Sequence, residues 1–191
     1  EIRLSLVGSE MCIRDRMSLV RKWRMANPNI VDMWKEIDEA SKEAVRYHRA
    51  VKCTSKNVIF DCDGEFMTIE LPVGRKLFYY KPEFKDKKIG RSTVPIRSLC
   101  YRGIDQTTKQ WISIDTYGGK LTENIVQAVS RDLLADAMLR MEKAGYGIVG
   151  SIHDEVITEV PEINAQEWYD NLVKIMSTPP SCCLLYTSPS P

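Results

Sequence analysis

The sequence predicts an α+β fold in which helices back an antiparallel sheet. Three observations predict it. Apolar residues recur at helical spacing between residues 30 and 44, and residues 58–80 change to the two-residue period of strands. A second helical stretch, from about residue 122 to Gly145, leads directly into a strand–turn–strand segment at 148–160. Strands and helices that cluster in this way, rather than alternating regularly, are typical of the class.

Composition bounds the possible functions only loosely. The chain has 191 residues, enough for one domain with a substantial core, and a formal charge of +1 that neither favours nor excludes nucleic acid. Basic runs at 21–24 and 75–91 are typical of solvated faces. No apolar stretch is long enough to span a membrane. The six cysteines match neither a metal-site spacing nor a disulfide pattern.

Both ends of the chain resemble a sequencing adapter that has been translated as if it were protein-coding sequence. One coding sequence permitted for residues 7–16, read as its reverse complement in another frame, encodes Cys183 to Pro191. The stretch resembles a transposon-type adapter. A signal peptide does not fit, because Arg3, Glu10 and Arg14 interrupt any apolar core. We expect residues 1–16 and 182–191 to be adapter-derived and residues 17–181 to be the genuine segment, without an internal domain boundary.

The first genuine elements are two helices. Ser18 to Ala26 is a short helical stretch, after which Asn27 is suited to the N-cap and Pro28 to the first position of the next helix. The apolar stripe of that helix is Ile30, Val31, Trp34, Ile37 and Ala44. We expect Trp34 to pack in the core rather than stack on a base, and His48 to be a surface residue.

Strands follow. Val58–Phe60, Phe66–Leu71 and Lys76–Tyr80 are separated by turn residues at 61–64 and 72–74, which predicts an antiparallel meander. Residues 82–90 are expected to form a charged loop. Further strands are expected at 94–101 and 111–114.

The strongest predicted helix comes next. Gly118 and Gly119 are expected to break the chain before it, so that it begins near Thr122, and Gly145 is expected to end it. Gln127 and Arg131 are four residues apart and share one face. The opposite apolar stripe is formed by Ile125, Val126, Val129, Leu133, Ala137 and Met141.

The segment after this helix is the most informative part of the chain. Two β-rich runs, 148–149 and 156–160, flank His153, Asp154 and Glu155 at the tip of a predicted hairpin. A carboxylate on a rigid hairpin is a suitable ligand for a hard cation such as Mg²⁺. The alternative is a surface hairpin with a polar tip and no ligand.

Several of these residues together resemble a known family. The stretch from Tyr117 to Leu134, followed by Ile152-His-Asp-Glu-Val156, resembles the C-terminal part of family A DNA polymerases, closest to bacteriophage-type members. Residues 24–31 with Trp34, and 71–76 followed by Tyr79 and Tyr80, are also similar to segments of that family. The resemblance covers nearly all of residues 17–181. It implies part of a polymerase palm, with the junction toward the fingers.

The resemblance also implies a chemistry: template-directed nucleotidyl transfer with two Mg²⁺ ions, acting on primer–template DNA and dNTPs in the cytoplasm of a phage-infected bacterium. Asp154 matches the metal-binding aspartate and Glu155 its acidic neighbour. His153 matches a histidine near the primer terminus. Gln127 matches a residue that touches the minor groove, where an amide can test base-pair geometry without reading sequence. Further DNA-binding candidates are Arg131 and Lys120.

Two features of the family are not found. Its second metal aspartate lies in an Asp-x-Ser-x-x-Glu strand, and its nucleotide-binding helix carries Arg-x₃-Lys-x₇-Tyr-Gly. Lys109 and Tyr117-Gly118 fit part of the second pattern, but Asp105 stands where the arginine belongs. We expect both features upstream of Met17 and the present segment to be inactive alone.

Two other functions remain open. A metal-dependent phosphohydrolase would use His153 and Asp154 as a metal dyad, with His48 as the only other histidine. A non-catalytic DNA-binding domain would carry the polar hairpin incidentally.

Overall fold

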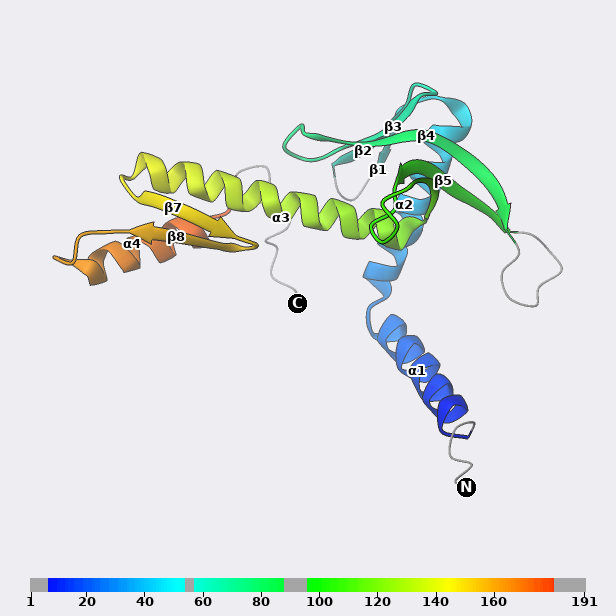
Figure 1. Cartoon of the computed structure of the whole chain (residues 1–191), viewed down its shortest axis with the longest axis horizontal. Helices are drawn as coiled ribbons and strands as arrows, with labels where there is room; N and C mark the ends of the chain where they lie inside the picture. The colour runs from blue at the N-terminus through cyan, green and yellow to red at the C-terminus, as the bar shows by residue number, and fades with distance from the viewer. Residues whose placement is uncertain (1–6, 54–56, 88–95, 181–191) are drawn as a thin grey trace.

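A computed structural model describes residues 7–53, 57–87 and 96–180, and its architecture confirms the predicted α+β class (Figure 1). A six-stranded and a two-stranded antiparallel sheet lie at different positions along one long helix, α3. The elements, in order, are α1 (Val7–Ala26), α2 (Pro28–Tyr47), β1 (Val51–Cys53), β2 (Val58–Cys62), β3 (Phe66–Glu70), β4 (Lys76–Lys87), β5 (Ile96–Ile104), β6 (Trp111–Thr116), α3 (Gly118–Lys143), β7 (Gly147–Ile152), β8 (Glu155–Glu159) and α4 (Ala165–Ser177).

The six-stranded sheet is the predicted meander, because its spatial order β1 to β6 is its order in the sequence and every pair is antiparallel. The strands predicted at 66–71, 94–101 and 111–114 are found as β3, β5 and β6, with residues 94–95 beyond the described part. Strand β2 runs two residues past Phe60 into the predicted turn. The pattern gave no sign of β1, which has only three residues.

The prediction of a charged loop over 82–90 is wrong for residues 82–87, which continue β4. Register shifts between Tyr80 and Glu83, so Pro82 falls in an irregularity where no ladder hydrogen bond is required of it. Lys81 turns the chain there with a φ of 45° and donates its backbone N–H to Glu65. The remaining residues of that prediction, 88–90, are not described.

Helix α2 covers one face of this sheet and provides much of the core. Ile37 and Ala44 are buried, as predicted, and belong to the same core cluster as Phe60 and Ile69 of the sheet. Trp34 is only half-buried and stacks on Trp23, with 5.8 Å between ring centroids. His48 is exposed, as expected, and ends the helix with a φ of 48°.

The start of α2 differs from the prediction in its cap. Pro28 occupies the first turn, but the Asn27 side chain does not cap the helix. Its Nδ2 donates instead to the carbonyl of Trp23, 2.8 Å away, at the end of α1. Helix α1 itself begins at Val7, well before Ser18, and so runs through residues 7–16. Within the described ranges, no helix combines the length and the apolar character that a membrane crossing needs.

Helix α3 begins at Gly118, four residues before the predicted start. The two glycines do not break the chain, because Gly118 is the place where α3 touches α2. A Cβ there would lie 1.9 Å from the carbonyl oxygen of Trp34. The Gly118 N–H donates to Asp38 Oδ1 at 2.9 Å, which occupies one of the free donors of the first turn.

The other end of α3 is as predicted. Gly145 takes a φ of 91°, and the N–H groups of Gly145 and Tyr146 donate to the carbonyls of Glu142 and Met141. This is the Schellman arrangement of a helix C-terminus. The predicted stripe holds for Ile125, Ala137 and Met141, but Val126 is 52% exposed. The buried face instead includes Leu121 and Leu134.

We predict that Gly118→Ala lowers the free energy of unfolding by about 1–3 kcal/mol, because the methyl group must displace the α2 backbone. In an unobstructed helix, exchanging glycine for alanine stabilises the folded protein by about 1 kcal/mol. The sign of the change in unfolding free energy therefore shows whether the contact exists. The measurement is urea unfolding followed by circular dichroism. Gly150→Ala is the matched control, since nothing lies within 4 Å of its added Cβ. Equal stability of the two variants would contradict the close contact.

Candidate nucleic-acid and metal site

Four of the predicted site residues line one hollow of about 500 Å³ between α3 and the tip of the β7–β8 hairpin. Helix α3 contributes Gln127 and Arg131, and the hairpin contributes His153 and Asp154. The sequence pattern did not single out the other two lining residues, Ser130 and Leu134. They stand three and seven positions after Gln127, a spacing that places them on the same side of a helix.

The hairpin tip is a two-residue turn, His153-Asp154, and not the predicted three-residue tip. Glu155 is the first residue of β8 and pairs with Ile152 across the turn. His153 has a φ of 54°, in the left-handed region of backbone conformation. Residues other than glycine adopt this region only at a cost in free energy. All three polar residues are exposed, and Glu155 does not line the hollow.

Contacts with α4 fix the hairpin end of α3. The Tyr146 hydroxyl donates to the carbonyl of Trp168 at 2.7 Å, and the two rings meet edge to face with 5.0 Å between centroids. At the C-terminus of α4, Arg140 Nη1 donates to the carbonyl of Ile175 and Nη2 donates to the carbonyl of Thr178, both at 2.8 Å. An arginine at a helix C-terminus also interacts favourably with the helix dipole.

The middle of α3 is held by the turn between β3 and β4. Arg75 Nε donates to Asp132 Oδ1 at 2.7 Å, and its Nη2 donates to the carbonyl of Ala128 at 2.9 Å. The Asp132 side chain is 15% exposed, and its other oxygen, Oδ2, is buried without a partner among the described residues. The sequence gave no signal for this pair, whose members are 57 positions apart.

A second, shallower hollow adjoins the first. Its lining residues are Leu77, Phe78, Tyr79, Tyr101, Asn124 and Gln127, so Gln127 belongs to both hollows. Asn124 Nδ2 donates to the Tyr79 hydroxyl at 2.9 Å. Burial raises the pKa of Tyr79 to about 12, with the Asn124 bond opposing the shift, so the phenol is neutral at physiological pH. The hydrogen bond ties the side chain of Asn124, three positions before Gln127 on α3, to strand β4.

Lys120 is not brought to the hairpin. Its Nζ donates to the carbonyl of Asp115 at 3.2 Å and lies 5.9 Å from the centroid of the Tyr117 ring. Seven residues separate it from Gln127, which is about 10 Å along a helix axis. Lys120 shares the helix face of Gln127 and Arg131 but lies near the other end of it.

The acidic residues at the hairpin tip are suitable ligands for Mg²⁺, but they are too few to form a complete metal site. Mg²⁺ is commonly held by one or two carboxylates together with substrate phosphates, which suits Asp154. In the described part of the chain, no group of three His, Cys, Asp or Glu side chains is placed to hold a metal ion. His48 lies elsewhere, with its Nδ1 3.7 Å from Cys62 Sγ. Among the described residues, the phosphohydrolase hypothesis therefore has no third ligand to join His153 and Asp154.

Comparison with known proteins gives one informative relative. The chain is 37% identical over 162 residues to the DNA polymerase of Bacillus phage SP02. The match takes in 84% of this chain but 24% of that polymerase, so the chain spans about a quarter of the relative's length. No protein-family model and no solved structure matches the chain.

We predict that Arg75→Ala lowers the free energy of unfolding by about 1–3 kcal/mol, because it leaves the largely buried Asp132 carboxylate without its cation. Lys76→Ala is the matched control. Its ion pair with Glu70, at 3.3 Å, is exposed and contributes less than about 1 kcal/mol. The double variant Arg75→Ala/Asp132→Ala should cost less than the sum of the single changes. Additive urea-unfolding energies would show that the pair does not hold α3.

Proposed function

We propose that this chain is a segment of a DNA-directed DNA polymerase of family A, from the C-terminal part of its palm. The observation that carries the proposal is the hollow shared by Gln127 and Arg131 of α3 and by His153 and Asp154 of the hairpin. The family resemblance implies roles for the same four residues, in contacting duplex DNA and in binding metal. The likeness to a phage DNA polymerase supports the same assignment.

Under this proposal, α3 supports the primer–template duplex. Gln127 is exposed at the junction of the two hollows, where its amide can donate to the acceptors that every base pair presents in the minor groove. Arg131, one turn further along the same face, suits a backbone phosphate. Such contacts favour any correctly paired duplex without selecting its sequence. His153 extends the surface toward the end of the primer strand.

Asp154 is proposed as one protein ligand of the catalytic metal, with Glu155 as an acidic neighbour. Bound Mg²⁺ ions would stabilise charge on the attacking and leaving oxygens of nucleotidyl transfer. The remaining ligands and the nucleotide-binding helix would come from other parts of a complete polymerase. The present chain should therefore bind DNA without extending a primer. We place the complete protein in phage DNA replication inside a bacterial host.

We predict that Gln127→Ala weakens binding of a blunt DNA duplex about 2- to 10-fold, the value of one hydrogen bond. Arg131→Ala should weaken binding of every sequence and lower the salt-dependence slope by about one. Fluorescence anisotropy at several salt concentrations measures both effects. Gln166→Ala on α4 is the control, since Gln166 bonds to Asp170 and does not line the hollow. Equal losses in Gln127→Ala and Gln166→Ala would contradict the duplex surface.

We predict that residues 17–181, exchanged for the matching segment of the phage SP02 polymerase, support Mg²⁺-dependent primer extension. Asp154→Asn in this chimera should reduce extension on the order of 1,000-fold, because a metal ligand contributes several kcal/mol to the transition state. The same change should leave duplex binding intact. Extension by the isolated chain, or an active Asp154→Asn chimera, would refute the assignment. An inactive chimera that still binds duplex would favour the non-catalytic reading.

A further inference from the structure

Four aromatic side chains form a ladder across the outer face of the six-stranded sheet: Phe66, Phe78, Tyr80 and Trp111. Side chains alternate along a strand, and the neighbours Met67 and Tyr79 point into the core. Phe66 pairs with Tyr80 across β3 and β4, so their side chains share the opposite face. Tyr80 pairs with Arg102 of β5, and Arg102 pairs with Ser113 of β6, so these side chains share one face. Trp111 lies two residues before Ser113 in β6, so its side chain is on the same face.

The rings of the ladder contact one another in series. Centroids of Phe66 and Phe78 are 6.0 Å apart, those of Phe66 and Tyr80 5.2 Å, and those of Tyr80 and Trp111 6.1 Å. Phe78 is nevertheless 65% exposed and Trp111 56% exposed. Isolated exposed hydrophobic residues need no explanation, but a contiguous set marks an interaction surface. The two ends of the ladder therefore present apolar rings to a partner.

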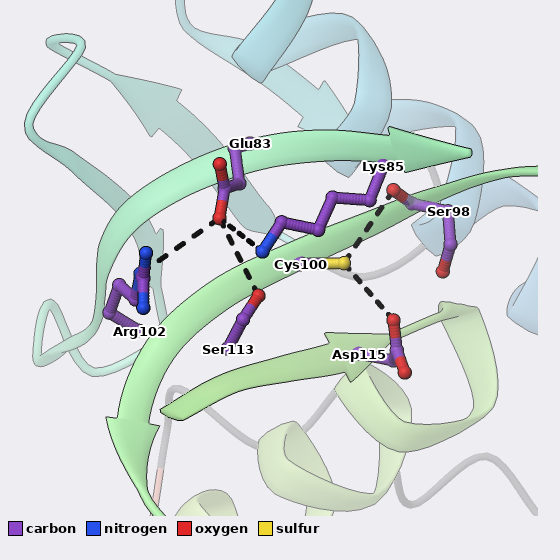
Figure 2. A network of polar contacts seen from close by, with 7 residues as sticks. All are labelled: Glu83, Lys85, Ser98, Cys100, Arg102, Ser113 and Asp115. Carbon is purple, nitrogen blue, oxygen red and sulfur yellow. Dashed lines mark hydrogen bonds and ion pairs between the residues drawn. The ribbon is translucent and has the colours of Figure 1, made fainter. Parts of the chain in front are cut away.

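Cations are interleaved with these rings. The Lys81 ammonium lies 5.3 Å from the centroid of the Tyr80 ring, and Arg102 follows Tyr80 in the same cross-strand row. Figure 2 shows Glu83 facing Lys85, Arg102 and Ser113, at 2.9, 3.9 and 3.5 Å. The Lys85 hydrogen bond is the main cause that lowers the pKa of Glu83, so this carboxylate stays ionised and helps to orient Arg102.

We propose that this ladder binds single-stranded nucleic acid, with unpaired bases stacked on Phe78 and Trp111 and phosphates near Lys81 and Arg102. Exposed aromatic rings with adjacent cations are the usual means of holding single strands without sequence preference. A protein partner suits the face less well, because lysine is depleted from the cores of protein interfaces.

The position of the ladder fits a strand that leaves the duplex. Phe78 and Gln127 both line the shallow hollow, so one end of the ladder borders the proposed duplex surface. An unpaired strand beside Gln127 would reach Phe78 first. That the strand is template DNA rests on the proposed function, whereas the stacking surface itself does not.

The test is fluorescence anisotropy of the 191-residue chain with labelled oligothymidylate of about 20 nucleotides, longer than a typical stacking site. Phe78→Leu keeps an apolar side chain but removes the ring, and Trp111→Ala removes the other platform. Each should weaken oligothymidylate binding about 5- to 100-fold. Trp111→Phe should preserve binding but lose the quenching of tryptophan fluorescence that stacking causes. Tyr169→Ala, 59% exposed on α4, is the control for loss of a surface ring.

Blunt duplex, measured with the same variants, separates this inference from the proposed function. Suppose that the ladder variants weaken oligothymidylate binding but Gln127→Ala leaves duplex binding unchanged. This result would support the ladder and refute the duplex surface. Oligothymidylate affinity unchanged in Phe78→Leu and Trp111→Ala, or equally reduced in Tyr169→Ala, overturns the ladder. Self-association abolished by Trp111→Ala, without oligothymidylate binding, would assign the face to a second copy and also overturns it.

Discussion

The close approach of α3 to α2 at Gly118 is the constraint on which the placement of the site depends. Because α3 is one continuous helix from Gly118 to Lys143, the contact at its first turn sets the direction of everything after it. The N–H of Gly118 is bound by Asp38, and one turn later the Thr122 hydroxyl donates to the Gly118 carbonyl at 2.7 Å. Arg75 then ties the middle of the helix to the sheet. The six-stranded sheet thus determines where Gln127 and Arg131 point.

Element lengths explain why the hairpin tip returns to these residues. From Arg131 to Lys143 the chain rises about 18 Å along α3, at roughly 1.5 Å per residue. Strand β7 then runs from Gly147 to Ile152, which is about 17 Å at roughly 3.3 Å per residue. The Schellman turn at Gly145 reverses the chain between them, so the tip comes back alongside the middle of the helix (Figure 1). The site depends on this match of lengths, and Tyr146 and Arg140 hold the reversal in place.

Local periodicity was sufficient to predict most elements, because burial on one face imposes it. The meander, the helix ended by Gly145 and the hairpin all follow from periods and turn residues. The errors occur where tertiary contact overrides local preference. Gly118 suggested a break, but its missing side chain serves a helix contact. Pro82 suggested a loop, but an irregularity in β4 accommodates it.

The candidate site was predictable only in part, for a related reason. Gln127 and Arg131 share a face by helical spacing, and His153 and Asp154 share a turn, so each pair could be found locally. That the two pairs meet depends on the lengths of α3 and β7 and on the reversal between them. The Arg75–Asp132 pair spans 57 positions and has no local signature. Lys120 shows the converse, since the resemblance suggested it, but it lies near the other end of the helix from the hairpin.

The backbone of His153 adopts a conformation that costs stability at the hairpin tip. A left-handed φ in a two-residue hairpin turn is relieved by glycine or asparagine, and a histidine there costs on the order of 1 kcal/mol. The His153 side chain is exposed, so packing does not offset the cost. Strain of this kind persists where the surroundings fix it and where the residue serves a ligand. Under the proposed function, His153, with Asp154 beside it and Gln127 and Arg131 across the same hollow, would offset this cost by contacting DNA.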